Sequence, residues 1–524
     1  MTLPLSIWTW LMAFLPVLVV VLLMLIFRWG GSRAGGMGWL TALLISVLFF
    51  GARFELLAVA QIKAVLLSLD VLYIIWPALL LFNIAREAGA IRMIGYALPG
   101  LTRDRVMQSL LIGWLMASFL QGMGGFGVPV AVVAPLLVGL GFAPIQSVAM
   151  ASFGHGWAVT FGSLATSFQS LMAVTGLPGE SLAPLTALLM GIACFPSGLL
   201  VALIGSGWKG LRRALVPVTL ISITLGVVQY LLATNGLWTL GATGASIAGL
   251  LVMIVWLRFT IGHQEGDGKS TIEKNPEDTG KNLWFSLFAY GLLVVMAFTV
   301  NMVQPLNDFL SQVSFTLAFP ETITTYGWVT SAGDGRVIRI FSHPGAILFY
   351  TCFIAFVLYR TFGYIKKGSL IQIFKRVVKS GLDSSLGILT MVGVASLMLH
   401  SGMTYLLAEG LSVSVSPQFY PAVAPFIGAL GAFITGSNNN SNVLFAVLQQ
   451  NTAELMNLSV PLILAAQTAG GALGSVLAPA KVIVGCSTVG LSGKEGAVMR
   501  KMLYYGALTI GSVALTAFVI NLIS

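Results

Sequence analysis

Two short stretches of this sequence place glycine, proline and polar side chains inside otherwise apolar runs. The first stretch contains Gln121, Gly122, Gly124, Gly125, Phe126, Gly127 and Pro129, and the second contains Gly436, Ser437, Asn438, Asn439, Asn440, Ser441 and Asn442. Glycine and proline interrupt a helix, and a membrane tolerates the freed backbone groups only where protein buries them or they line a cavity. Helix N-termini at such breaks present N–H groups and a partial positive charge, which suit a carboxylate. The pattern therefore predicts a small-anion site built from two helix breaks.

The two stretches belong to a longer repeat. Gly162 follows Gly122 by 40 residues, and Gly474 follows Gly436 by 38 residues, each inside a second glycine-rich segment. For one break alone, glycine that permits close packing and Asn that caps a helix would be a sufficient explanation. Two related breaks at matching distances favour a duplicated functional unit.

The flanking residues indicate the direction of each unit. The helix entering the first break starts beside Arg103 and Arg105, whereas the helix entering the second starts after Pro417 and Pro421. Basic residues collect in cytoplasmic loops, so the two units are expected to run in opposite directions. Inverted repeats with broken helices are a common architecture of secondary transporters.

The elements that must position these residues are membrane helices. Of the 524 residues 57% are hydrophobic and only 8% are charged, against about 25% charged residues in soluble domains. Apolar runs recur along the whole chain, so we expect an all-α polytopic membrane protein with about 12 to 14 membrane elements, some broken or re-entrant. This composition excludes a soluble enzyme, a nucleic-acid binder and a disulfide scaffold. The net charge of +10 is explained by cytoplasmic loops.

The expected organisation is two transmembrane halves joined by one polar loop. Residues 1–257 carry the first repeat, with its break near 121–129, and residues 282–524 carry the second, with its break near 436–442. Residues 258–281 are polar and rich in glycine and acids, which predicts a flexible cytoplasmic loop. A second polar stretch, near 304–341, is expected on the outside.

A few ionisable residues fall within apolar segments, where such residues are often functional. Those that could carry a coupling proton are His155, Asp70, Asp383 and His400. Each has a structural alternative: a histidine bonded to a backbone carbonyl, or a carboxylate near a helix end. Lys481 could pair with a substrate carboxylate, or with an acid, or extend to the membrane interface. The sequence suggests neither a metal site nor a cofactor, and it has no phosphate-binding loop for an ATP-driven pump.

At these residues the sequence resembles the L-lactate permease family. The resemblance covers roughly residues 75 to 505, and its motifs are LLLFNIAREAG (79–89), QGMGGFGVPVA (121–131) with APLLVGLGF to Phe142, GSNNNSNVLF (436–445), QTAGGALGS (467–475) and TVGLSGKE (488–495). It implies a transporter rather than an enzyme, multi-pass in the inner membrane and without a cofactor. The implied activity is proton-driven uptake of L-lactate, glycolate or a similar 2-hydroxy monocarboxylate. The implied fold is two inverted repeats, each with a broken or re-entrant helix, as in the wider ion-transporter superfamily.

The expected binding site joins both breaks. The carboxylate is expected at the N–H groups of Gly122–Gly127 and at the amides of Asn438–Asn442, and the hydroxyl at Ser437, Ser441, Gln467 or Thr468, with His155 and Lys481 nearby. Three positions depart from the family pattern: Gln121 stands where Glu is usual, Lys481 where a small polar residue is usual, and His155 where an Asn-Thr pair is more frequent. These departures keep open another small organic anion, such as a sulfonate or dicarboxylate. Coupling to Na⁺ instead of H⁺ and a homo-oligomer in the lipid bilayer also stay open.

Overall fold

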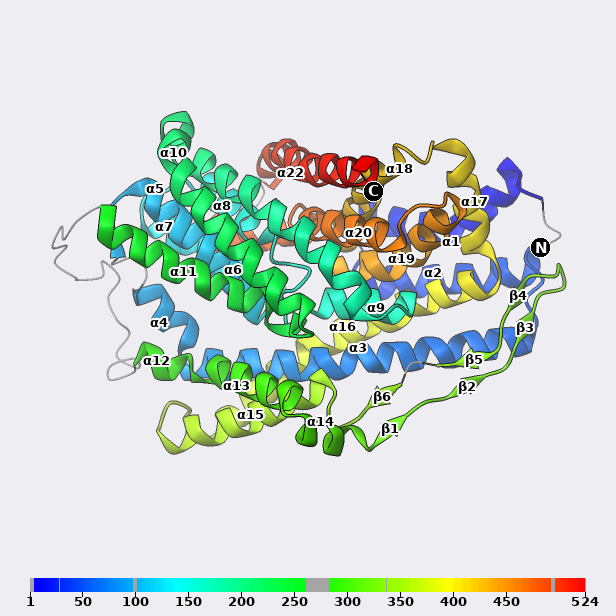
Figure 1. The fold of residues 1–524 in the computed structure, drawn as a ribbon, viewed down its shortest axis with the longest axis horizontal. Coiled ribbons are helices and arrows are strands. Elements are labelled where there is room, and N and C mark those ends of the chain that lie inside the picture. Colours follow the sequence, from blue (N-terminus) through cyan, green and yellow to red (C-terminus); the bar gives the residue numbers. More distant parts are fainter. Residues whose placement is uncertain are drawn as a thin grey trace.

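The structure, a computed structural model, describes residues 4–27, 29–97, 101–125, 127–260, 282–335, 337–491 and 495–523. Most of this part is helical (Figure 1). The predicted loop 258–281 falls almost wholly outside the described residues.

Up to residue 260 the helices are, in chain order, α1 (Ile7–Leu25), α2 (Gly31–Leu48), α3 (Phe54–Ala88), α4 (Ala90–Ala97), α5 (Arg105–Gln108), the π-helix η2 (Ser109–Met116), α6 (Ala117–Met123), α7 (Val128–Gly139), α8 (Pro144–Gly156), α9 (Thr166–Thr175), α10 (Gly179–Thr234), the 3₁₀ turn η3 (Trp238–Leu240) and α11 (Gly241–Thr260). After residue 281 they are α12 (Leu283–Ser286), α13 (Phe288–Met302), α14 (Gln304–Ser311), α15 (Pro344–Thr361), α16 (Ser369–His400), α17 (Met403–Ser414), α18 (Tyr420–Thr435), α19 (Asn438–Leu455), α20 (Val460–Ser475), α21 (Pro479–Thr488) and α22 (Glu495–Ile523).

The described part confirms the expected all-α membrane fold. It contains nine helices long and apolar enough to cross a membrane, or ten if the bent pair Phe288–Val300 and Gln304–Ser311 is one span. Helix α10 counts once, although Gly207, with φ 66° and ψ −165°, divides it into two helices. The short apolar helices α7 and α18 are further elements of the broken kind that the sequence predicts.

Packing sorts the helices into two bundles, and each bundle draws on both halves of the sequence. The α3 bundle consists of α1, α2, α3, α13, α15 and α16, and the α20 bundle consists of α6–α11 and α18–α22. In Figure 1 the helices α3, α13 and α15 lie along the lower edge, with α10 and α22 along the upper edge. The bundles meet where α16 contacts α19, α3 contacts α9 and α1 contacts α18.

Glycine allows α2 to pack closely between its neighbours. A Cβ on Gly35 would collide with the Thr390 hydroxyl of α16, and a Cβ on Gly38 would collide with Val20 of α1. Small residues that bring backbones together are the usual way to stabilise helix contacts in a membrane, where apolar side chains gain little by leaving lipid. Helix α2 is therefore fixed against α16, and its first turn keeps a defined position.

A narrow β-ribbon fills the predicted polar stretch near 304–341. It pairs β1 (Ser314–Phe315) with β6 (Ile338–Arg339), β2 (Ala318–Phe319) with β5 (Gly333–Asp334), and β3 (Thr322–Ile323) with β4 (Val329–Thr330), all antiparallel. The ribbon runs beside α3 (Figure 1). Its tip is held where the Thr325 N–H donates to the Gly51 carbonyl at 3.0 Å, and Trp328 Nε1 donates to the Leu399 carbonyl at 3.2 Å.

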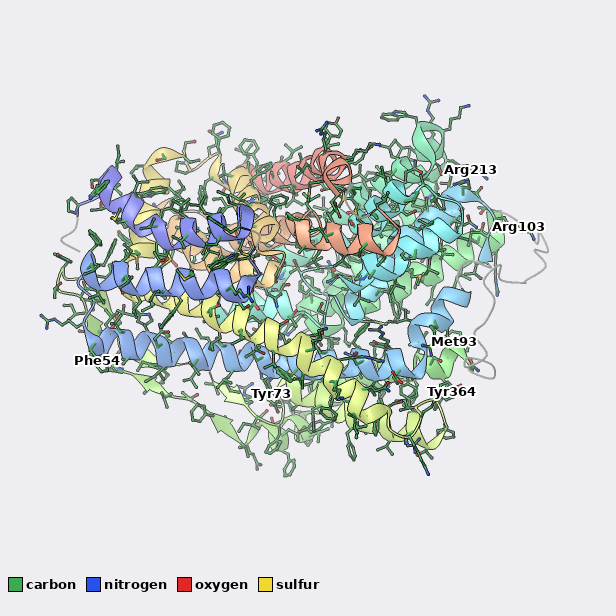
Figure 2. All side chains as sticks on the ribbon, turned by 180° about the vertical axis from the view of Figure 1, so that it is seen from behind. Phe54, Tyr73, Met93, Arg103, Arg213 and Tyr364 are labelled. Atoms are coloured by element: carbon green, nitrogen blue, oxygen red, sulfur yellow. The ribbon has the colours of Figure 1, made fainter. Side chains whose placement is uncertain are left out.

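The two ends of the molecule differ. Arg103, Arg213 and Tyr364 lie at one end of the long axis, and Phe54 lies at the other (Figure 2). Arg213 forms an ion pair with Asp104 at 2.7 Å. Arg103 and Arg213 thus lie at the same end, as expected of basic residues in cytoplasmic loops.

Candidate functional site

Both predicted breaks occur where the sequence places them. Helix α6 ends at Met123 and α7 begins at Val128, while Gly125 and Gly127 adopt left-handed φ values of 53° and 83°. Helix α18 ends at Thr435, Gly436 is left-handed with φ 73°, and α19 begins directly after Ser437. We call these connections the first tip (124–127) and the second tip (436–437). Phe126 lies outside the described residues.

The asparagine run forms the first turns of α19 rather than an unwound segment. Asn438 and Asn442, four residues apart, lie on the same side of the helix, and their Nδ2 atoms donate to Thr468 Oγ1 at 3.2 and 2.9 Å. The Oδ1 atoms of both residues are buried without a hydrogen-bond partner. A buried amide oxygen without a donor is costly, so these atoms favour a ligand that brings a hydroxyl.

Another non-helical segment, 157–165, separates α8 from α9. Ser163, Leu164 and Ala165 have φ values of 47°, 59° and 61°, a left-handed conformation that costs a non-glycine residue about 1 kcal/mol or more. Two of their N–H groups hold the end of α6: Ser163 N donates to the Gln121 carbonyl at 2.7 Å, and Leu164 N donates to the Gly122 carbonyl at 3.3 Å. A strained backbone of this kind is typical of functional sites.

The first tip is crowded by its neighbours. A Cβ on Gly125 would collide with Ser163 Oγ, a Cβ on Gly124 would lie 2.6 Å from the Phe82 ring, and a Cβ on Gly122 would lie 2.6 Å from Thr243 Oγ1. Only glycine fits these three positions. Gln121 is buried, and its Oε1 has no partner.

Thr160, inside segment 157–165, and Ser167, two residues after it, bond the first turns of α19. Asn438 Nδ2 donates to Thr160 Oγ1 at 3.3 Å, and Asn442 Nδ2 donates to the Ser167 carbonyl at 3.0 Å. Ser167 Oγ donates to Asn439 Oδ1 at 2.6 Å. We call Thr160, Ser167, Asn438, Asn439, Asn442 and Thr468 the polar cluster. Thr160 and Ser167 were not among the predicted site residues, although both lie in the polar run TFGSLATS (160–167) within an apolar block.

Ser441 and Gln467, also predicted site residues, belong to a separate buried network. Gln467 Nε2 donates to Ser441 Oγ at 3.2 Å, and Ser441 Oγ donates to the Gly428 carbonyl at 2.7 Å. Gln449 Nε2 donates to Gln467 Oε1 at 3.1 Å, and the Tyr420 hydroxyl donates to Gln449 Oε1 at 2.7 Å. These bonds fasten α18, α19 and α20 together and hold the second tip in place.

Two cavities lie between the α3 bundle and the α20 bundle, and one of them reaches the second tip. The Arg33 cavity, of about 660 Å³, is lined by Phe27, Trp29, Gly30, Gly31, Ser32, Arg33, Ser384, Gly387, Ile388, Thr435, Ser437, Asn439 and Asn440. Ser437, Asn439 and Asn440 thus face this cavity, whereas Asn438 and Asn442 face Thr468.

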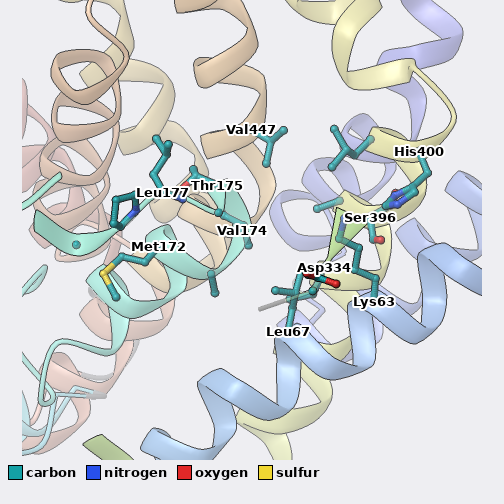
Figure 3. Close-up of a pocket in the computed structure, with 18 of the residues that line it drawn as sticks. Lys63, Leu67, Met172, Val174, Thr175, Leu177, Asp334, Ser396, His400 and Val447 are labelled. Carbon is teal, nitrogen blue, oxygen red and sulfur yellow. Dashed lines mark hydrogen bonds between the residues drawn. The ribbon is translucent and has the colours of Figure 1, made fainter. Parts of the chain in front are cut away.

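The second cavity, the Lys63 cavity, has about 600 Å³ and is lined by residues that include Lys63, Leu67, Met172, Thr175, Asp334, Ser396, His400 and Val447. Figure 3 shows Met172, Val174, Thr175 and Leu177 on one side of it and Lys63, Asp334, Ser396 and His400 on the other. His400 Nδ1 bonds the Ser396 carbonyl at 2.9 Å.

The remaining ionisable candidates lie apart from the polar cluster. His155 Nδ1 bonds the Ala151 carbonyl at 2.7 Å, while Nε2 is buried without a partner. Lys481 is half-buried, and its Nζ donates to Ser475 Oγ at 3.1 Å across the turn between α20 and α21. Asp383 is on α16, but its side chain lies outside the described residues.

Asp70 is buried against His343, a residue that the sequence analysis did not consider. His343 Nε2 lies 3.1 Å from Asp70 Oδ1, and the Gly345 N–H donates to His343 Nδ1 at 3.2 Å. Because Nδ1 accepts a hydrogen bond, the ring proton is on Nε2 and is donated to Asp70. The Tyr73 ring stacks on His343 with centroids 4.8 Å apart. The proline after His343, a typical first residue of a helix, is the one sequence signal for this cap.

Comparison with known proteins identifies one family along nearly the whole chain. The family model for L-lactate permease matches residues 9–524. An L-lactate permease from Halalkalibacterium halodurans is 26% identical over 98% of this chain and 96% of its own length. The L-lactate permease of Streptococcus iniae is 27% identical over 87% of this chain and 93% of its own length. That of Escherichia coli is 25% identical over 94% of this chain and 92% of its own length. This multi-pass membrane protein belongs to the L-lactate permease family.

Proposed function

We propose that this chain imports L-lactate, or a similar 2-hydroxy monocarboxylate such as glycolate, by proton symport across the inner membrane. The observation that carries the proposal is the polar cluster, a group of buried amides and hydroxyls contributed by both repeats and placed at a helix break. Membership of a permease family makes the protein a transporter rather than an enzyme.

The chemistry of the cluster matches a 2-hydroxy acid. The partnerless oxygens of Asn438 and Asn442 can accept a hydrogen bond from the substrate hydroxyl. The N-terminus of α19, together with the Asn440 amide, can donate to the carboxylate. Gln121, Gly122, Gly124, Gly125 and Gly127 place the N-terminus of α7 on the other side of segment 157–165. The proposed set also includes Phe126, which lies outside the described residues, and Lys481.

Transport by alternating access requires the site to open to each side in turn. The two cavities lie on opposite stretches of the contact between the bundles, so a shift of the α20 bundle along α16 would exchange access between them. The two repeats, inverted as the flanking charges predict, supply the related tips for such a movement.

The proton is proposed to bind a carboxylate or histidine away from the anion. Asp70 with His343 is favoured, because two titratable groups share one hydrogen bond there. His155, His400 and Asp383 are the other candidates. Amide-rich helix breaks can also bind Na⁺ through oxygen, so Na⁺ is varied separately in the test.

The test is uptake of radiolabelled L-lactate into proteoliposomes under an imposed inward proton gradient. The proposal expects saturable uptake that collapses with a protonophore and is unchanged by Na⁺. Competition by glycolate, pyruvate, sulfonates and dicarboxylates defines the substrate class. Folded protein that transports no lactate under either gradient would refute the proposal and direct the search to the other small anions.

A further inference from the structure

The Arg33 cavity contains a set of groups suited to an anion. Its lining residues include one cation, Arg33, and the polar residues Ser32, Ser437, Asn439 and Asn440. No acidic side chain is among its described lining residues. Arg33 is exposed and has no ion pair or hydrogen bond with any described residue.

Two further features lie beside Arg33: the Asn440 side chain and the first turn of α2. Asn440 is only 9% exposed, lines the cavity and makes no side-chain hydrogen bond with a described residue. Helix α2 begins at Gly31 without a side-chain cap, so the N–H groups of its first turn face the same region. A Cβ on Gly31 would lie 3.5 Å from Asn440 Nδ2, which places the start of α2 against the second tip.

A partnerless amide that is buried to this extent is costly unless a ligand or water satisfies it. Guanidinium, amide N–H and helix N-terminal N–H groups are all donors, and a carboxylate offers only acceptors. The complementarity is therefore with a carboxylate, and the volume of about 660 Å³ leaves room for a small acid and water.

Helix α16 connects this cavity to the other one. Ser384, Gly387 and Ile388 line the Arg33 cavity, and Val392, Ser396 and His400 line the Lys63 cavity. These positions recur every three or four residues and so form one face of the helix. Ile388 and Val392 are four residues apart, which is about 6 Å along a helix. The two cavities are thus successive openings along one surface, with about one turn of α16 between them.

We infer that Arg33 binds the substrate carboxylate at one end of the transport path, together with Asn440 and the first turn of α2. The inference rests on the proposed function and adds Arg33 to it as the cationic residue of the binding site. Arg33 lies on the α3 bundle rather than on either repeat.

The experiment compares Arg33→Gln, Arg33→Lys and Arg53→Gln in the proteoliposome uptake assay. Arg53 is an exposed arginine at the start of α3 that lines neither cavity, so its substitution changes the net charge equally. Because Arg33 is exposed to solvent, its hydrogen bonds to a carboxylate are partly screened. The expected rise in KM for L-lactate in Arg33→Gln is about tenfold, while Arg33→Lys and Arg53→Gln remain near the wild type.

A second measurement uses lactamide, the neutral isostere of lactate, as a competitor. The wild type is expected to bind lactate much more tightly than lactamide, and Arg33→Gln should reduce this preference by a similar factor. A rise in KM without a change in preference would overturn the inference, since a general loss of folding weakens both compounds alike.

Anionic phospholipids offer a related chemistry, because their headgroups carry a net negative charge that a guanidinium also attracts. The assay is therefore repeated in liposomes of phosphatidylcholine alone. If the effect of Arg33→Gln persists there, the site belongs to the substrate. If the effect disappears, the inference is overturned. If Arg33→Gln takes up L-lactate with the same kinetics as the wild type, the role of Arg33 is refuted and the proposed function stays intact. Absence of wild-type lactate uptake would instead refute the proposed function.

Discussion

Thr468 offers the sharpest test of the polar cluster. Its hydroxyl accepts from Asn442 Nδ2 at 2.9 Å and from Asn438 Nδ2 at 3.2 Å. Thr468→Val keeps the shape of the side chain and removes this acceptor. Each amide then retains one partner, the Ser167 carbonyl for Asn442 and the Thr160 hydroxyl for Asn438.

The loss from the amides is therefore two hydrogen bonds of about 1 kcal/mol each, or about 2 kcal/mol in all. A third and longer contact, 3.5 Å between Thr468 Oγ1 and Thr160 Oγ1, is lost with them. If both bonds hold the site in its binding conformation, the affinity for L-lactate falls by up to about thirtyfold. Thermal unfolding in detergent should also begin a few degrees lower. Thr468→Ser keeps the hydroxyl and should restore most of the uptake.

The matched control is Thr351→Val. The Thr351 hydroxyl is buried and donates only to the Ile347 carbonyl, at 2.8 Å, on α15 of the other bundle. This variant should unfold at a similar temperature to Thr468→Val or slightly higher, with unchanged KM. Unchanged uptake and unfolding in Thr468→Val would show that the two amides do not depend on Thr468, and the reasoning about the cluster would be wrong.

Three other substitutions test separate features. Asn440→Leu, at the second tip, should abolish L-lactate uptake while the protein still inserts into the membrane; normal transport would remove Asn440 from the site. Asp70→Asn, which leaves His343 Nε2 without a carboxylate, should prevent proton-driven accumulation of lactate but still allow exchange of lactate for lactate. If the variant still accumulates lactate, the coupling proton binds elsewhere. Gly162→Ala should greatly reduce folded protein, because its Cβ would lie 2.9 Å from the Gln121 carbonyl and collide with that of Ala158. Gly139→Ala, in open space on α7, is its control, and equal yields of the two would contradict the packing of segment 157–165.

The breaks were predictable because their causes are local. Glycine at 125, 127 and 436 adopts positive φ, a conformation that other residues rarely adopt, so the helix ends could be located from residue types alone. Whether the asparagine run is helical or unwound was harder to predict. Asn and Ser suit both unwound backbone and helix starts, and the sequence could not decide that Asn438 to Asn442 would be helical.

The partners of these residues were not predictable, since they depend on packing. Ser167 and Asn439 are 272 residues apart, and Asp70 and His343 are 273 apart. One sequence contains no information on which distant polar groups meet, and Thr160 and Ser167 look like ordinary helix-end residues. For the same reason the sequence does not distinguish Arg33 from the basic residues of cytoplasmic loops, and only the packing of α2 shows that it lines a cavity together with Ser437.

The packing around the two tips limits what can move. Helix α9, from the first half of the sequence, contacts α19, which follows the second tip, and α21, from the second half, contacts α7, which follows the first tip. Each tip is thus supported by a helix from the other half of the sequence, and the hydrogen bonds of the polar cluster join the same two halves. Separating these helices would break the buried bonds of Asn438, Asn439 and Asn442 together. A movement that preserves these bonds would carry the α20 bundle as one unit and would slide at the contact of α16 and α3 with α19 and α9, beside both cavities.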